Sequence, residues 1–182
     1  MMERLEDIVM GAERAFEAEG FRGIGIDKIL AQSGASTRTL YKHFGSRDGL
    51  VVEVLRRRHL IYMKRLDEAD HLDPIGELFE VQREWINEHT KSGCMFLRAY
   101  GEYAVVSADV TATVLEHKKQ FETEIQRRVK MALGRPDPDL ALQIWLLFEG
   151  ATALASLRGT LVLGTAKDAA ESLLQSGVER AS

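Results

Sequence analysis

The chain has 182 residues, a hydrophobic fraction of 45%, a formal net charge of −4, three prolines and a single cysteine. One cysteine excludes an intrachain disulfide and fits a reducing compartment. The acidic N-terminus lacks the apolar core of a signal peptide, and no apolar run reaches the roughly 18 residues of a membrane span. We therefore expect a cytoplasmic protein with no membrane partner.

The charge is unevenly distributed along the chain. Residues 1–65 hold 12 Lys and Arg against 9 Asp and Glu, whereas residues 66–182 hold 12 against 19. A basic N-terminal part attached to an acidic remainder is compatible with phosphate binding at one end, and equally with an ordinary solvated surface.

Apolar residues recur at helical spacing, and no segment alternates with the period of a strand. A first helix starts near Leu5 and ends at Gly20, a residue type suited to a helix C-terminus. Short helices follow at 26–33 and 37–43, and Ser46 caps a long helix that extends to about residue 69. Further helices are predicted at 74–91, 94–105, 108–133, 138–158 and 165–179. The sequence thus predicts an all-α protein of about nine helices, with a three-helix head at 1–48 and a helical body at 49–182.

Two short helices joined by a tight glycine-containing turn suit reading of the DNA major groove. In the second helix Leu40 and Phe44 are four residues apart and can pack inward together, which leaves hydrogen-bonding and cationic side chains outside. Arginine can contact guanine edges, and hydroxyl, amine and imidazole groups suit phosphates. The residues predicted to contact double-stranded DNA are Ser36, Thr37, Arg38, Thr39, Tyr41, Lys42, His43 and Arg47.

These residues resemble the N-terminal part of the TetR family of bacterial transcriptional regulators. The resemblance rests on Gly20-Phe21, Ile26–Ile29, Ser33–Ser36, Thr39–Phe44 and Ser46–Leu50. The chain departs from the family pattern at Ile24 and Gly25, where a hydroxyl cap is usual, and at Leu30 and Ala35. The pair Gly93-Cys94, which opens a predicted body helix, is similar to a subset of the family.

The segment 139–158 is apolar nearly all round, so it must be buried on more than one side. Heads of this type usually read palindromic operators, so we expect a two-fold homodimer. The segment 139–158, together with 166–178, is the predicted dimerisation surface. The alternative is that 139–158 is only the central core helix of one monomer.

The resemblance implies that the body binds a small-molecule effector that changes the spacing of the two heads. Aromatic and polar residues of the predicted body helices are the candidates, although plain core packing or surface pairing, for example of Arg98 with Glu102, explains each of them as well. Cys94 is either a thiol activated by a helix N-terminus, which would sense an electrophile or oxidant, or an inert core thiol. The candidate effector residues are Trp85, Cys94, Arg98, Tyr103, His117, Phe121, Trp145 and Glu149.

The sequence carries no catalytic motif, and its five histidines show no pair at the spacing of metal ligands, so we predict no enzyme, no metal site and no cofactor. The favoured function is a ligand-responsive transcriptional regulator, more specifically a repressor released from its operator by an effector. The alternative is an all-helical interaction or scaffold protein that does not bind DNA.

Overall fold

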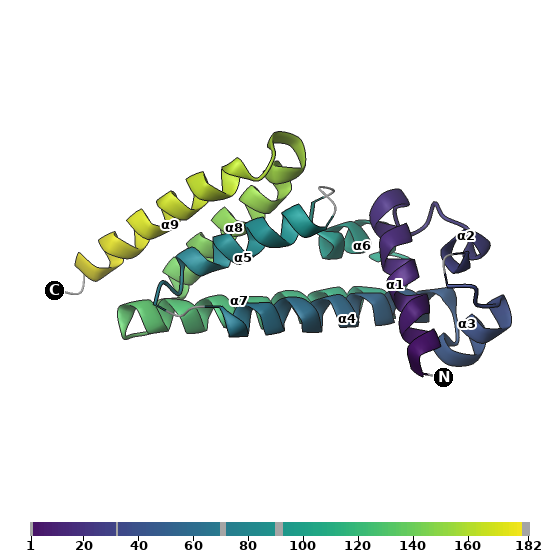
Figure 1. The fold of residues 1–182 in the computed structure, drawn as a ribbon. Coiled ribbons are helices and arrows are strands. Elements are labelled where there is room, and N and C mark those ends of the chain that lie inside the picture. Colours follow the sequence, from purple (N-terminus) through teal and green to yellow (C-terminus); the bar gives the residue numbers. More distant parts are fainter. Residues whose placement is uncertain (1, 32, 70–71, 90–92, 180–182) are drawn as a thin grey trace. The chain divides into compact units, whose positions relative to one another are not determined.

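The structure is a computed structural model that describes residues 2–31, 33–69, 72–89 and 93–179. Within these ranges the chain forms nine α-helices and no strand, which confirms the all-α prediction (Figure 1). The helices are α1 (Met2–Glu19), α2 (Ile26–Leu30), α3 (Thr37–Phe44), α4 (Arg47–Glu68), α5 (Gly76–Glu88), α6 (Met95–Tyr103), α7 (Ala108–Leu133), α8 (Pro138–Arg158) and α9 (Leu161–Glu179).

The helices form two compact units. Unit 1 comprises residues 1–61 and 94–117, and unit 2 comprises residues 62–93 and 118–182. The long helices α4 and α7 therefore each contribute residues to both units. The boundary predicted at residues 48 and 49 instead lies inside α4, and unit 1 includes α6, which lies far along the chain from the predicted head.

Unit 1 is built around an apolar core that α1, α4 and α6 share. Phe16 on α1 and Phe21 after it are fully buried, with ring centroids 5.0 Å apart. Leu40 of α3 and Leu50 of α4 are also fully buried in this core. The period of 3.6 residues in α1 and α4 places these apolar side chains on one face, which packs the short helices α2 and α3 against the rest of the unit.

A buried ionic cluster joins α1 to α4 within unit 1. Arg58 donates to Glu13 over 2.8 Å and to Glu17 over 2.5 Å, and its side chain is only 7% exposed. Arg57 donates to the second oxygen of Glu13 over 2.9 Å. Because buried charges are tolerated only when they are paired and hydrogen-bonded, this cluster fixes how α1 lies along α4.

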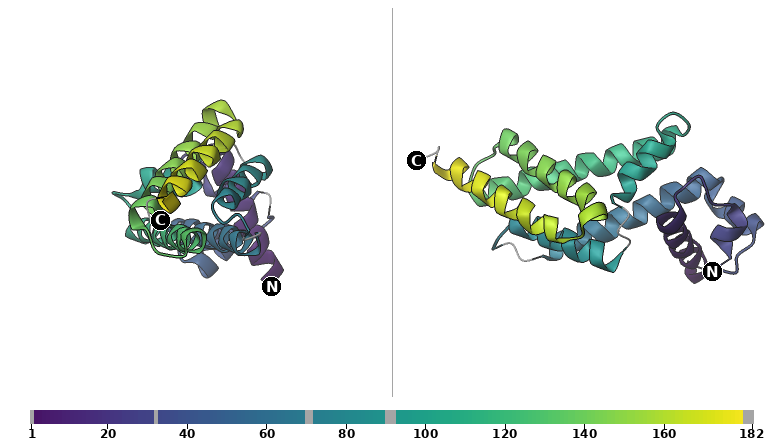
Figure 2. Two further views of the ribbon diagram at one scale, coloured as in Figure 1. Left: turned by 90° about the vertical axis from the view of Figure 1, so that its left-hand side faces the viewer. Right: turned by 90° about the horizontal axis from the view of Figure 1, so that it is seen from above.

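Unit 2 contains α5, α8 and α9 with the adjoining parts of α4 and α7. Helix α9 runs back along α8 and also packs on α5, as the views in Figures 1 and 2 show. The fully buried Arg128 of α7 donates to the carbonyl oxygens of Leu66 and Pro74 over 2.5 and 3.0 Å, and to Glu124 over 2.6 Å. This guanidinium joins the end of α4 and the start of α5 to α7.

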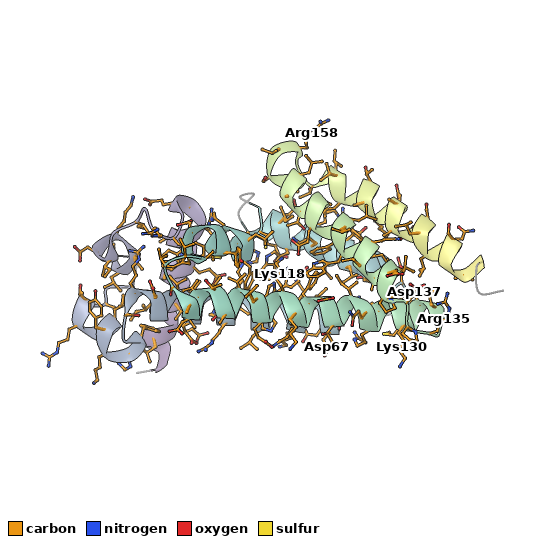
Figure 3. All side chains as sticks on the ribbon, turned by 180° about the vertical axis from the view of Figure 1, so that it is seen from behind. Asp67, Lys118, Lys130, Arg135, Asp137 and Arg158 are labelled. Carbon is orange, nitrogen blue, oxygen red and sulfur yellow. The ribbon has the colours of Figure 1, made fainter. Side chains whose placement is uncertain are left out.

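The connection between α7 and α8 follows the sequence signals closely. Gly134 ends α7 with a φ of +73°, and Asp137 caps α8 by accepting the N–H of Leu140 over 3.1 Å, with Pro138 in the first turn. Arg135 lies in the same connection and donates to the carbonyl of Gly177 over 3.2 Å (Figure 3). The predicted helix 138–158 is therefore confirmed, because its start and stop signals are local.

Several predicted helix ends differ from the observed ones. Helix α2 stops at Leu30 rather than Ser33, α5 begins at Gly76 rather than Pro74, and α9 begins at Leu161 rather than Thr165. At α5 the Asp73 side chain accepts the N–H of Gly76 over 2.9 Å, so the predicted cap is present but the helix starts after it. The predicted end of this helix at Lys91 lies outside the described residues.

Candidate nucleic-acid interface

Helix α3 is fixed at both ends by local interactions. The Ser36 hydroxyl accepts the backbone N–H of Thr39 over 3.2 Å and contacts the Thr39 hydroxyl at 2.9 Å. At the other end Gly45 has a φ of +73° and donates its N–H to the carbonyl of Tyr41. A side-chain cap at the start and a left-handed glycine at the end stabilise a helix of only eight residues.

The faces of α3 divide as the sequence predicts. Leu40 is fully buried and Phe44 is half-buried against the same core. Thr39 is half-buried. The remaining predicted contact residues in and before this helix are exposed, and they are Ser36, Thr37, Arg38, Tyr41, Lys42 and His43. One face of α3 is thus anchored, while the other presents hydrogen-bond donors, acceptors and positive charge, as a helix that enters a major groove must do.

The turn from α3 into α4 explains the spacing of its residues. The predicted cap at Ser46 is confirmed, because its hydroxyl accepts the N–H of Gly49 over 2.9 Å. A side chain at Gly49 would overlap the carbonyl oxygen of Phe44. The Ser46–Leu50 segment therefore needs a glycine at this position so that α4 can start close to the end of α3.

The side chain of Arg47 contacts backbone carbonyl groups of unit 1. Its guanidinium donates to the carbonyl oxygen of Ile24 over 2.7 Å and to that of Phe21. These carbonyls belong to the segment between α1 and α2, where Gly25 precedes α2 and provides no side-chain cap. Arg47 thus holds the segment that leads into α2, and its predicted contact with DNA stays a prediction.

Helix α6 holds the other side of the same segment. Arg98 donates to the carbonyl oxygens of Phe16 and Glu17 over 2.5 and 3.2 Å, and Glu102 accepts the N–H groups of Phe21 and Arg22. The alternative of an Arg98–Glu102 pair is therefore wrong, since each residue binds the end of α1 instead. A cation at the carbonyl end of a helix and an anion at the following N–H groups both match the backbone charges there.

Tyr103 also lies at this junction. Its side chain is 3% exposed, and its ring meets that of Phe21 edge-on at a centroid distance of 6.1 Å. Burial raises the pKa of Tyr103, and a hydrogen bond from Arg47 partly opposes that rise. Tyr103 and Arg98, both predicted to bind an effector, thus contact the segment leading into the helix-turn-helix, and their effector role stays a prediction.

Two histidines that are far apart in the sequence contact each other in unit 1. The Nδ1 atoms of His59 on α4 and His117 on α7 are 2.8 Å apart, and the His117 ring stacks on Phe96 at a centroid distance of 3.5 Å. The two residues are 58 positions apart, so no local pattern indicates this contact. Among the described residues no group of three or more His, Cys, Asp or Glu side chains is arranged to hold a metal ion.

Four of the predicted effector residues lie in unit 2. The buried Trp85 and Phe121 both contact the Tyr62 ring, at centroid distances of 5.1 and 6.1 Å. Glu149 accepts hydrogen bonds from Trp145 Nε1 over 3.0 Å and from Lys118 Nζ over 2.5 Å. Lys118 is labelled on α7 in Figure 3. Trp85 and Phe121 thus belong to an aromatic cluster around Tyr62, and Trp145 and Glu149 belong to a polar cluster with Lys118. The role of these residues in effector binding stays a prediction.

Cys94 precedes α6 as its N-cap residue, which agrees with its predicted place at a helix start. It has intermediate exposure, and its side chain packs against the core of unit 1. Both interpretations of this thiol, as a sensor or as a core residue, are compatible with that position.

Comparison with known proteins agrees with the geometry of the head. The sequence profile of "Bacterial regulatory proteins, tetR family" matches residues 8–54. The HTH-type transcriptional regulator LmrA of Bacillus subtilis (strain 168) is 37% identical over 51 residues, which are 28% of this chain and 27% of LmrA. The chain therefore matches only about a quarter of the length of this curated relative.

Solved structures share the whole fold. SCO4454, a TetR-family transcriptional regulator from Streptomyces coelicolor, superposes with a TM-score of 0.86 at 24% identity, over 98% of this chain and 97% of its own. A putative transcriptional regulator from Saccharomonospora viridis, in complex with choline, superposes with a TM-score of 0.75 at 17% identity, over 96% of this chain and 97% of its own.

The matched segment 8–54 contains α2, α3 and the capped start of α4, which are the elements that place the exposed polar face of α3. This match identifies residues 8–54 as the N-terminal segment of the bacterial regulatory proteins of the tetR family, and the solved structures show that the whole chain shares their fold.

Proposed function

We propose that this protein is a DNA-binding transcriptional regulator, more specifically a repressor that binds a palindromic operator as a homodimer and is released by a small-molecule effector. The observation that carries the proposal is the division of α3 into a buried face with Leu40 and an exposed face with Arg38, Tyr41 and Lys42. We infer a regulatory and not a catalytic role, because this face offers recognition groups and no catalytic arrangement.

The outer face of α8 and α9 supports the homodimer. Leu146 is 66% exposed and Leu154 is 43% exposed, and an apolar groove of about 340 Å³ runs between them and the residues of α9. A Cβ at Gly150 or at Gly164 would meet no atom within 4 Å. An exposed apolar face with small residues, on a helix whose other side packs into unit 2, suits close packing against a second copy of the same two helices.

The exposed leucines of α8 raise the question of whether this helix crosses a membrane. Helix α8 is long and apolar enough to cross a membrane by length and composition, and 39% of its most apolar window is buried. The buried part packs within unit 2 on residues such as Ile144 and Phe148. In our proposal the partner subunit covers the exposed leucines, so α8 is an interface helix in a cytoplasmic protein.

The interior of unit 2 supports binding of an effector. Tyr62 donates to Gln82 over 2.7 Å, and Gln82 donates to Thr152 over 3.1 Å, all within an apolar and aromatic core. A few polar groups among aromatic side chains are typical of small-molecule sites. The structural neighbour from Saccharomonospora viridis was solved in complex with choline, which supports a small-molecule effector in this chain without identifying it.

A mobility-shift assay with random genomic duplexes at several salt concentrations tests the proposal. We expect binding at low salt that weakens steeply as salt rises, because neutralised phosphates release counterions. Lys130→Ala, which replaces an exposed lysine of α7 in unit 2, is the matched control and should leave affinity unchanged. A protein with no affinity for duplexes at low salt would instead be an interaction or scaffold protein, and the proposal would be wrong.

A further inference from the structure

Unit 1 contains a polar pocket whose residues the proposed function does not use together. Its volume is about 300 Å³, and its lining residues are Arg22, Arg47, Asp48, Tyr103 and Val106. They come from the connection between α1 and α2, the start of α4, the end of α6 and the connection between α6 and α7. Two of the five carry a guanidinium group, and one carries a carboxylate.

The positive charge of Arg47 is fixed in place but not neutralised. Its guanidinium donates to the carbonyl oxygens of Ile24 and Phe21, which are neutral acceptors. It also opposes the rise in the pKa of the nearby Tyr103 phenol. No described carboxylate forms an ion pair with Arg47. Since a guanidinium has five N–H donors, this side chain is held in a single orientation while its charge remains available.

Arg22 and Tyr103 add further donors. The backbone N–H of Arg22 is bound to Glu102 over 2.8 Å, but its exposed guanidinium makes no hydrogen bond or ion pair with any described residue. Burial raises the pKa of Tyr103, so the phenol stays protonated at neutral pH. A protonated phenol carries one O–H hydrogen that it can donate to a ligand.

We propose that this pocket binds a small oxyanion, either a carboxylate or a phosphate group, between the guanidinium groups of Arg22 and Arg47 with the Tyr103 hydroxyl as a third donor. Planar guanidinium groups bind such oxygens in pairs. Asp48 is the only carboxylate of the lining, and it forms no described ion pair with either arginine. Asp48 repels the anion and lowers its affinity.

A bound oxyanion would connect three segments that position the helix-turn-helix. Arg22 precedes α2, Arg47 begins α4, and Tyr103 ends α6. A ligand that bridges the three segments stabilises their present arrangement. One of them is the connection between α1 and α2, which Glu102 already binds. The pocket is thus a regulatory site within the DNA-binding unit, separate from an effector site in unit 2.

Titration of the full-length protein with inorganic phosphate, followed by backbone amide NMR shifts at constant ionic strength and pH, tests the site. We expect saturable shifts at the amides of residues 22 and 103 in the millimolar range. Arg22→Gln should weaken binding by about tenfold or more, because one charge-assisted contact is lost. Asp48→Asn should tighten it, because the only carboxylate of the lining becomes neutral.

Arg56→Gln is the matched control, since Arg56 is an exposed arginine of the same unit that does not line the pocket. Its phosphate affinity should match that of the unsubstituted protein. Arg22 is exposed, so circular dichroism of Arg22→Gln should show an intact helical fold. Shifts that do not saturate, or equal affinity in Arg22→Gln and the unsubstituted protein, would overturn the proposal.

A second measurement identifies the source of the oxyanion and does not decide whether the site exists. If a phosphate of the DNA backbone occupies the pocket, Arg22→Gln should reduce the salt dependence of duplex binding by about one phosphate contact. If a free anion occupies it, that dependence is unchanged. Both results agree with the site, and the NMR titration stands independently even if the protein does not bind DNA.

Discussion

The carboxylate of Glu102 accepts the backbone N–H of Arg22 over 2.8 Å, although 80 residues separate them in the chain. The same carboxylate accepts the N–H of Phe21, and Arg98, one turn earlier on α6, donates to the last carbonyls of α1. Helix α6 therefore binds backbone groups at the end of α1 and in the two residues that follow Gly20. The position of α2, and with it α3, depends on a helix outside the predicted head.

Glu102→Ala should destabilise unit 1 and weaken DNA binding. Two backbone N–H groups lose a charged acceptor, which costs about 1–3 kcal/mol. Urea unfolding measures the loss, and amide hydrogen exchange of residues 21 and 22 should accelerate. Glu53→Ala, an exposed glutamate of the same unit, is the control. Unchanged exchange at residues 21 and 22 would show that Glu102 does not hold this segment.

Arg38→Ala and Lys42→Ala should affect DNA binding differently. Arg38 is exposed in the first turn of α3 and suits bidentate contact with a base, so its loss should relax sequence preference at a cost of about 1–3 kcal/mol. Lys42 suits a phosphate, so its loss should weaken binding to all duplexes alike. Binding to an operator and to a random duplex measures both effects. Identical behaviour of the two variants would contradict this division of roles.

Leu146→Glu should separate the proposed dimer. Leu146 is 66% exposed on α8 and lines the apolar groove beside α9. A carboxylate buried there would be unpaired, so the dissociation constant should rise by about 30-fold or more, the range of an interface hot spot. Sedimentation equilibrium measures it. Leu115→Glu, which replaces an exposed leucine of α7 in unit 1, should leave the dimer intact.

Because of Glu124, the stability of unit 2 should decrease at acidic pH. Desolvation raises the pKa of this carboxyl, but hydrogen bonds from Arg127 and Arg128 outweigh it, so its pKa lies below the ordinary value of 4.5. The stabilisation is therefore fully present above pH 4.5 and is lost as the pH falls through the lowered folded-state pKa.

Glu124→Gln should reduce the free energy of unfolding at pH 7, and the difference from the unsubstituted protein should shrink as the pH falls below 4.5. Urea unfolding across this range measures it. Glu122→Gln replaces a half-buried neighbour on the same helix and serves as the control. A difference that stayed constant down to strongly acidic pH would contradict the assignment of the stabilisation to the ionised Glu124.

Features governed by neighbouring residues were predictable from the sequence. The inward side chain of Leu40, the cap at Ser46 and the start of α8 at Pro138 all appear as predicted. Each depends on atoms within four residues along the chain, so the pattern of residue types determines the geometry. The same holds for the all-α fold, since helical periodicity is itself local.

Contacts between distant segments were decided only by the tertiary structure. Arg47 donates to the carbonyl oxygens of Phe21 and Ile24, and His59 contacts His117 across 58 residues, and no local pattern indicates either contact. A long, flexible cationic side chain binds the nearest unpaired acceptor, and only packing decides which acceptor that is. The sequence by itself thus determined the helices and the exposed polar face of α3. The tertiary structure decided that α6, through Arg98 and Glu102, belongs with the head and holds it in place.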